Sequence, residues 1–407
     1  MENLPQKEIS PYSRGRTAAL ILALVTGLGA AFLTGTIATC GLGVALIQRR
    51  SSLSTTALPI VSLVAAGLGL GLPLAWQALS GLSGKPSGRL RLSRVGGWVL
   101  ILIYALAVAG GQAVLNLRPS PLFALPPFHV AAFTLPPLLL LWGAASLVND
   151  RQFTWRQAWG GLGGGAFGAV GLAFLIEAVL LALGVALAVA VTALSPEGGA
   201  DLRNWRPTPG DLADPALLRS LLRNPAVVVG LLASVSVIVP LIEEPAKSLV
   251  PALAGAWQTP TVNRLFLWGV ASGAGFALFE GIMNGGLNTE QWGLVALLRV
   301  GSSAMHCLAA GLTGWGWGQV WTQRKWLRLI LAYAGAIAMH GLWNAVSIGM
   351  AVASGGLEGG AVQNALVAAS TGLLVFLTLG AIMALTIMAK RLSTQGAAPQ
   401  IETRSEV

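Results

Sequence analysis

Two carboxylates and a lysine stand close together in the segment "LIEEPAKSLV", residues 241–250. Glu243 and Glu244 are adjacent, and Lys247 follows them by four and three positions. In a helix this spacing lets both carboxylates reach the ammonium along one face. Pro245 removes a backbone N–H and frees carbonyl groups beside the pair. An ionised carboxylate held in this way can take a proton from water, so the segment has the groups of a general base.

More polar side chains follow in the next three apolar runs, at spacings that place them on helix faces. They are Glu280 with Phe276 in "FALFE", Arg299 with His306, and His340 with Asn344 in "MHGLWNA". An ionised group in the middle of a span costs about 2.5–3.5 kcal/mol on insertion scales. Ionisable groups concentrated in four successive spans therefore indicate one shared polar cavity. Glu177 lies in an earlier run, stands apart from the others, and is not assigned to this cavity.

These residue types support two kinds of hydrolytic chemistry. In the first, a carboxylate base activates water for attack on a peptide carbonyl, and histidines with an amide stabilise the oxyanion or protonate the leaving amine. In the second, a divalent metal is held by Glu244, His306 and His340, because two histidines with one or two glutamates form an acceptable zinc set. The sequence has no HExxH pair, so such a metal site would have to be assembled across helices. We assign no cofactor from the residues alone, and zinc stays an alternative.

Composition indicates the elements that must position these groups. Of the 407 residues, 55% are hydrophobic and only 10% are charged, whereas soluble domains carry about 25% charged residues. The apolar runs are continuous rather than alternating, which predicts an all-α polytopic membrane helix bundle and not a barrel. We expect about ten spans, near 17–47, 56–80, 96–117, 128–148, 160–194, 226–256, 264–286, 293–320, 329–353 and 362–389. The fifth, rich in glycine, is either one long tilted helix or a re-entrant piece followed by a helix.

Charge placement predicts the orientation of the chain. The formal net charge is +10, but the basic residues lie mainly in short links between apolar runs, as orientation signals do, so we expect no nucleic-acid partner. Both termini are expected in the cytoplasm. The predicted regions are a tail at 1–16, an N-terminal transmembrane region at 17–194, an extracytoplasmic polar link at 195–225, a catalytic transmembrane core at 226–353, a final span within 354–389, and a tail at 390–407.

"EEPAK" (243–247) followed by "FALFE" (276–280) resembles the paired EExxK and FxxxE motifs of the PrsW family of intramembrane proteases. That family is similar to the CAAX prenyl endopeptidases and bacteriocin-processing membrane proteases. The resemblance covers about 226–350. It implies that Glu243 and Glu244 are the paired catalytic glutamates, that Glu280 is the acid of the second motif, and that His306 and His340 are the later histidines. Lys247, Arg299, Asn344 and Phe276 are supporting residues.

One position departs from the family pattern. The later family motif often has two histidines four apart, whereas here Asn344 stands four residues after His340. An asparagine suits an oxyanion donor better than a zinc ligand, so the residues favour metal-free glutamate chemistry while leaving the metal alternative open.

The resulting hypothesis is an intramembrane endopeptidase of a bacterial inner (plasma) membrane. Its expected substrates are single-span or membrane-anchored proteins cut during regulated intramembrane proteolysis. The main alternative is a proton- or cation-coupled transporter that uses the same Glu/His cluster as a relay. Transporters of that kind usually contain an internal repeat, and the sequence shows no partner for "EEPAK" in its first half. A catalytically silent scaffold that binds transmembrane helices is a third possibility. The first spans carry no readable motif and are expected to pack around the core or to gate substrate entry.

Overall fold

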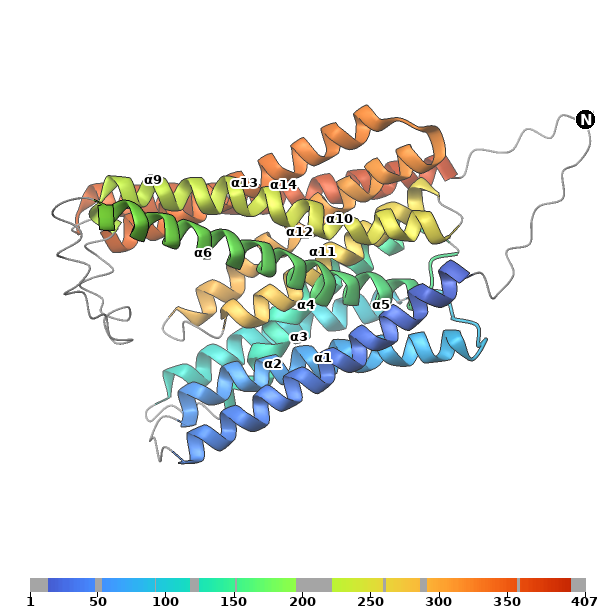
Figure 1. Cartoon of the computed structure of the whole chain (residues 1–407), viewed down its shortest axis with the longest axis horizontal. Helices are drawn as coiled ribbons and strands as arrows, with labels where there is room; N and C mark the ends of the chain where they lie inside the picture. The colour runs from blue at the N-terminus through green and yellow to red at the C-terminus, as the bar shows by residue number, and fades with distance from the viewer. Residues whose placement is uncertain are drawn as a thin grey trace, which may run out of the picture.

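The computed structural model describes residues 14–47, 53–91, 93–117, 124–150, 152–194, 222–258, 261–285, 291–356 and 359–396. Helices account for the regular structure of these residues, apart from one isolated bridge between Arg89 and Thr154. The helices are α1 (Arg14–Ile47), α2 (Leu53–Leu82), α3 (Arg94–Asn116), α4 (Leu125–Val148), α5 (Trp155–Gly163), η2 (Gly164–Ala169), α6 (Val170–Leu194), α9 (Pro225–Ala233), η4 (Ser234–Ile238), α10 (Val239–Trp257), α11 (Val262–Gly285), α12 (Trp292–Gln323), α13 (Trp326–Gly356) and α14 (Ala361–Gly396) (Figure 1).

Ten helices in the described part of the chain are long and apolar enough to cross a membrane. They coincide with the ten predicted spans, with ends that differ by a few residues. The all-α polytopic bundle predicted from composition is therefore confirmed. Most of the predicted polar link at 195–225, and most of both predicted tails, lie outside the described residues.

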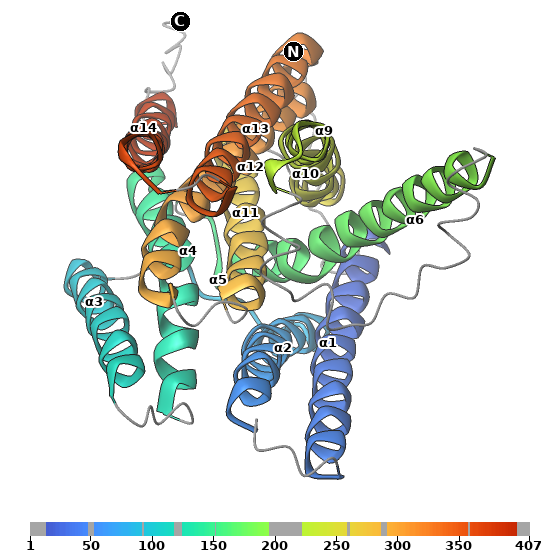
Figure 2. The same cartoon turned by 90° about the vertical axis from the view of Figure 1, so that its left-hand side faces the viewer.

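Helix α11 forms the centre of the bundle, with α4, α5, α10 and α12 packed around it (Figure 2). In its most apolar stretch 89% of the residues are buried, the largest share of any span described. Glycines allow this position. A Cβ added at Gly273 would overlap the backbone carbonyl oxygen of His306, and one added at Gly275 would overlap that of Leu162. Small residues let the backbones of neighbouring membrane helices approach closely, so α11 is clamped between α12 and α5.

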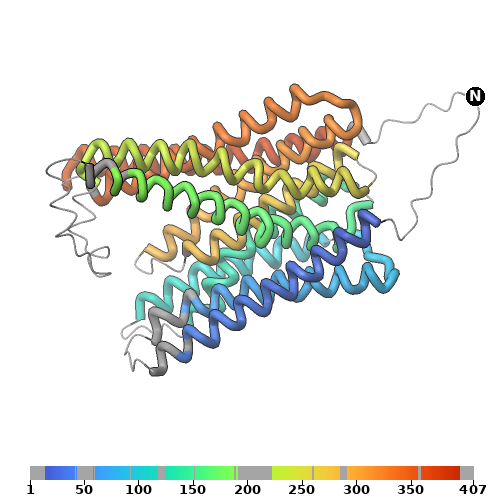
Figure 3. Tube along the Cα trace, viewed as in Figure 1, coloured from blue at the N-terminus to red at the C-terminus, as the bar shows by residue number. Residues whose placement is uncertain are grey.

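The fifth span is one helix that changes direction at a π-helical turn. It runs through α5, η2 and α6 without a break, so the re-entrant alternative does not apply. Its first half lies inside the bundle against α11, whereas α6 runs out to the periphery (Figures 2 and 3). Most described side chains of α6 are exposed and apolar, as expected of a surface that faces lipid. A Cβ at Gly165, in η2, would overlap the backbone of Ser272 on α11, which is why this turn needs glycine.

Candidate active site

Helix α10 carries the two glutamates and the lysine, and prolines break its own hydrogen-bond ladder. Pro251 has no N–H, so it cannot bond the carbonyl of Lys247 four residues earlier. In the structure the hydroxyl of Ser272 on α11 donates to that carbonyl, at 2.8 Å. The freed carbonyl thus ties α10 to α11 at the residue whose side chain stands at the centre of the site.

The start of α10 is held by α13 in a similar way. Pro240 leaves the carbonyl of Ser236, in the π-helical turn η4, without its α-helical donor. Gly341 of α13 lies against that carbonyl so closely that a Cβ would overlap it. Three residues along α13, Asn344 donates from Nδ2 to the carbonyl of Val235 at 2.8 Å. The segment "HGLWN" therefore fixes η4 in addition to supplying His340.

The ammonium of Lys247 lies at the centre of the cluster and contacts both glutamates and His306. Its Nζ lies 2.6 Å from Oε1 of Glu244, 3.4 Å from Oε2 of Glu243 and 2.8 Å from Nδ1 of His306. It also stands 4.4 Å from the ring centroid of Phe276. The side chains of Lys247 and Glu244 are both fully buried, and that of Glu243 is 12% exposed. A buried charge survives only with such partners, and here four of the predicted site residues supply them.

His306 is held from both sides of its ring. Nδ1 accepts from Lys247, so the ring proton is assigned to Nε2, which donates to Oε2 of Glu280 at 2.9 Å. Glu280 is itself held by Arg299 at 3.1 Å and by Asn284 at 3.1 Å. The predicted supporting role of Arg299 thus takes the form of an ion pair with the carboxylate behind His306. The Glu280 side chain is 30% exposed, which makes it the more open end of the cluster.

His340 bridges the two adjacent glutamates. Its Nδ1 lies 2.7 Å from Oε1 of Glu244, and its Nε2 lies 3.8 Å from Oε2 of Glu243. Because a carboxylate accepts, the proton is assigned to Nδ1, and Nε2 presents its lone pair towards Glu243. The rings of His306 and His340 lie edge to face, with centroids 5.0 Å apart. All five residues predicted as catalytic are therefore brought into one cluster across α10, α11, α12 and α13.

A divalent metal fits part of this cluster. Glu243, His306 and His340 each offer one ligand atom, and these atoms lie within 4.8 Å of one another. The two histidines each have a carboxylate behind them, Glu280 and Glu244, as histidines that ligate metals usually do. The set contains Glu243 where the sequence-based ligand set has Glu244. Glu244 instead pairs with Lys247 and His340, and its Oε2 is buried with no hydrogen-bond partner within the described part of the chain.

Some residues near the cluster were not assigned to it from sequence. Glu177 on α6 has a buried Oε1 without a hydrogen-bond partner among the described residues, and it lies within electrostatic range of Lys247 and Glu280. No spacing rule links α6 to α10, so the one available signal was that Glu177 is an acid inside a span. Ser272 is another such residue, since its role depends on a proline in a different helix. His129, by contrast, is satisfied by Ile282 and Trp292 and serves packing.

A family model described as "PrsW family intramembrane metalloprotease" matches residues 153–379, more than half of the chain. The chain belongs to this family. As a PrsW family member it is an intramembrane protease, a hydrolase that acts on a protein substrate within the membrane. The match begins at Phe153, so it includes the fifth span, which the motif resemblance over 226–350 did not reach. None of the curated proteins and none of the solved structures compared with the chain matches it. Family membership does not favour the transporter alternative.

Proposed function

We propose that this PrsW family member cuts single-span or membrane-anchored proteins within or near their transmembrane segment, with water activated by the Glu243/Glu244 pair. The observation that carries the proposal is the buried cluster in which Lys247, both glutamates and both histidines contact one another. These groups come from the middle of their spans, so the reaction would take place at membrane depth.

The two glutamates are proposed to divide the work. Glu243, His306 and His340 would hold the divalent metal that the family description implies, and Zn²⁺ suits this mixed nitrogen and oxygen set. When bound, such an ion supplies Lewis-acid polarisation of the peptide carbonyl and of water. Glu244 would be the base, since Lys247 and His340 fix its Oε1 while Oε2 makes no hydrogen bond within the described residues.

The reaction then follows the ordinary course of peptide hydrolysis. Glu244 takes a proton from water, and the water oxygen attacks the carbonyl carbon of the scissile bond. Collapse of the tetrahedral intermediate breaks the C–N bond, and the proton passes to the leaving nitrogen, which gives a carboxylic acid and an amine. Glu280 and Arg299 would keep His306 oriented. Asn344 has a second amide N–H besides the one given to Val235 and is the proposed oxyanion donor.

The cellular setting is proposed from charge placement. The basic links and both termini would lie on the cytoplasmic side of the inner (plasma) membrane. The catalytic core would be 226–353, with the preceding spans packed around it.

Cleavage in a reconstituted membrane tests the proposal. Full-length protein in lipid nanodiscs would be incubated with a library of single-span substrates, and products would be located by mass spectrometry. Glu243→Gln and Glu244→Gln should each lower the cleavage rate by at least about 10²-fold, as expected for loss of a general base or an equally essential group. Asp150→Asn, a carboxylate that pairs with Arg264 away from the cluster, is the matched control and should cleave normally. Unchanged cleavage by both glutamine variants would contradict the assignment. Ion-dependent uptake into proteoliposomes without proteolysis would support the transporter instead.

A further inference from the structure

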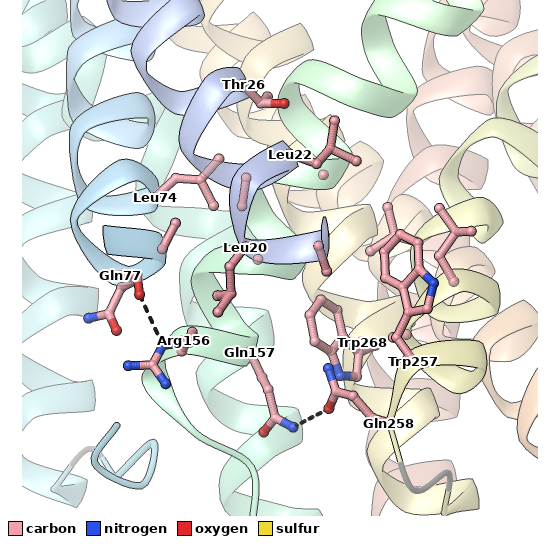
Figure 4. A pocket seen from close by; sticks show the side chains of 18 of the residues that line it. Leu20, Leu22, Thr26, Leu74, Gln77, Arg156, Gln157, Trp257, Gln258 and Trp268 are labelled. Atoms are coloured by element: carbon pink, nitrogen blue, oxygen red, sulfur yellow. Dashed lines mark hydrogen bonds between the residues drawn. The ribbon is translucent and has the colours of Figure 1, made fainter. Parts of the chain in front are cut away.

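A cavity lies against α10, and neither Glu243 nor Glu244 lines it. It has a volume of about 680 Å³ and is lined by residues of α1, α2, α5, η2, α10 and α11. Its inner wall is apolar and includes Leu20, Leu22, Leu74 and Ala246. Figure 4 shows Arg156 and Gln157 on the α5 side of the cavity, and Trp257 and Gln258 on the α10 side. A volume of this size lies within the usual range of small-molecule and cofactor sites.

Two arginines stand at the polar end of the cavity. Arg16 of α1 and Arg156 of α5 both line it and lie within Coulombic range of each other. Among the described residues that line the cavity, none is acidic. Arg156 donates from Nε to the carbonyl of Gln77 at 2.9 Å and from Nη2 to that of Lys85 at 2.8 Å. A guanidinium has five N–H donors, so these two bonds fix Arg156 and leave further donors for a ligand. Two guanidinium groups at one polar end can hold an anion between them.

A buried donor in the same wall also lacks an acceptor. Trp268 of α11 lines the cavity and is only 9% exposed, yet its indole Nε1–H makes no hydrogen bond within the described part of the chain. A buried donor left in that state costs free energy. The neighbouring Gln258 does not supply the acceptor, since its Oε1 accepts from Gln157 at 2.7 Å. The tryptophan therefore points to a ligand that brings an oxygen acceptor to the α11 side of the cavity.

We propose that this cavity binds an anionic phospholipid. Its phosphate would lie between Arg16 and Arg156, an ester or headgroup oxygen would accept from Trp268, and an acyl chain would follow the apolar wall. The basic end coincides with the Lys/Arg-rich links, where positive residues and interfacial tryptophans meet the headgroups of a bilayer. A polypeptide segment would instead bring N–H groups, for which this basic end has no acceptor side chain except glutamines and hydroxyls.

The position of the cavity gives the lipid a structural consequence. One wall is formed by α1 and α2, which lie outside the matched family region, and the opposite wall by α10, which carries the catalytic glutamates on another face. Ala246, in the cavity wall, is next to Lys247 in the chain. A bound lipid would join the N-terminal helices to the catalytic core, so its loss should also loosen α10.

Lipid binding can be measured on the full-length protein in detergent by native mass spectrometry. Palmitoyl-oleoyl phosphatidylglycerol should bind with one-to-one stoichiometry and at least about tenfold more tightly than the phosphatidylcholine with the same chains. Trp268→Phe removes the donor and keeps the ring, and Arg156→Gln removes the charge and keeps an amide donor for the two carbonyls. Each substitution should weaken the binding of phosphatidylglycerol by about tenfold, as expected for loss of one hydrogen bond from Trp268 or one charged contact from Arg156.

Matched controls separate the site from general surface effects. Arg94→Gln makes the same change of charge at an exposed position on α3, and Trp98→Phe makes the same ring change at a side chain that is 72% exposed. Both should bind phosphatidylglycerol like the wild type. If Arg156→Gln does not fold, Arg16→Gln replaces it, and Trp268→Phe tests the site independently. Equal binding of the two lipids, or wild-type binding by every cavity variant, would overturn the proposal. So would equal occupancy by inorganic phosphate alone, or displacement of the lipid by a single-span peptide.

Discussion

The ammonium of Lys247 lies 2.8 Å from Nδ1 of His306 and 3.4 Å from Oε2 of Glu243. A side-chain cation therefore contacts two of the three groups that could hold a metal ion, namely Glu243, His306 and His340, called the metal triad below. Both ring nitrogens of His306 are engaged, by Lys247 and by Glu280. A metal ion can reach His306 only if one of these partners withdraws, so Lys247 and the metal should compete for the same place.

Removal of the lysine charge should raise the affinity for metal. Lys247→Met keeps a long side chain and deletes the ammonium. We expect Zn²⁺ to bind at least about tenfold more tightly, because a unit charge a few ångströms from a divalent ion costs several kcal/mol even at an effective dielectric constant of about 20. Competition with a chelator and metal analysis of the purified protein give the value. Lys247→Arg keeps the charge and is the control. An unchanged affinity in Lys247→Met would mean that the two cations do not compete.

Variants of the two adjacent glutamates should differ in metal content, although we expect both variants to lose cleavage. Glu243→Gln removes a member of the triad and should lose the metal. Glu244→Gln should keep it, because Glu244 lies behind His340 and is not one of the three. Metal analysis of both proteins after identical dialysis distinguishes them. If Glu244→Gln alone lost the metal, the ligand set deduced from the sequence would be the correct one.

Glu280 should increase the affinity for a metal through its hydrogen bond to His306. Its carboxylate accepts from Nε2 of that ring at 2.9 Å, and loss of such a partner typically lowers metal affinity by about 10- to 100-fold. We expect this loss in Glu280→Gln, measured by chelator competition. Asn284→Ser provides the control, since it deletes a different hydrogen bond to the same carboxylate and leaves the histidine contact in place. Similar losses in both variants would assign the effect to the carboxylate's position and not to its bond with His306.

The sequence predicted the spans and the members of the cluster for one physical reason. Charged groups are costly inside a bilayer, so Glu243, Glu244, Lys247, Glu280, His306 and His340 stood out against apolar neighbours. This cost identifies the residues of the cluster, but it does not predict which side-chain nitrogen contacts which carboxylate oxygen. Which glutamate completes the candidate metal-binding group with the two histidines depends on the rotation of α10 about its axis, and in the structure it is Glu243. Two contacts hold α10 in this rotation: Ser272 of α11 bonds the Lys247 carbonyl, and Asn344 of α13 bonds the Val235 carbonyl in η4. Ser272 is remote in sequence from Lys247, and the composition of η4 does not mark it out.

Other parts of the fold could not be predicted from the sequence, because they depend on how neighbouring helices pack together. The run of glycines at 160–168 indicated close helix contacts, but not the π-helical turn or the exit of α6 to the periphery. A π-turn depends on how a helix meets its neighbours, and the sequence of α5 and α6 alone reads as a single apolar span.

Gly165 should be intolerant of alanine. A Cβ there would overlap the backbone of Ser272, and overpacking of this kind costs about 1–3 kcal/mol. We expect Gly165→Ala to lower the melting temperature and to reduce cleavage, since α11 carries Glu280. Gly171→Ala, on the same long helix, has open space around the added methyl and should be neutral or slightly stabilising, as expected of glycine replaced in a helix. Thermal unfolding in detergent compares the two variants, and equal stability would show that η2 can move away from α11.

The serine that bonds the carbonyl of Lys247 should matter more than other buried serines. Ser272 and Ser62 are both fully buried, and each hydroxyl donates to a backbone carbonyl, at 2.8 Å and 2.6 Å. The Leu58 carbonyl that Ser62 contacts also has the α-helical N–H of Ser62 itself, whereas the Lys247 carbonyl lacks one because residue 251 is proline. Ser272→Ala should therefore cost about 1–3 kcal/mol of stability, the penalty for an orphaned buried acceptor, and Ser62→Ala much less. Thermal unfolding and cleavage rates measured on both proteins check this, and equal effects would mean that the carbonyl freed by Pro251 finds another donor.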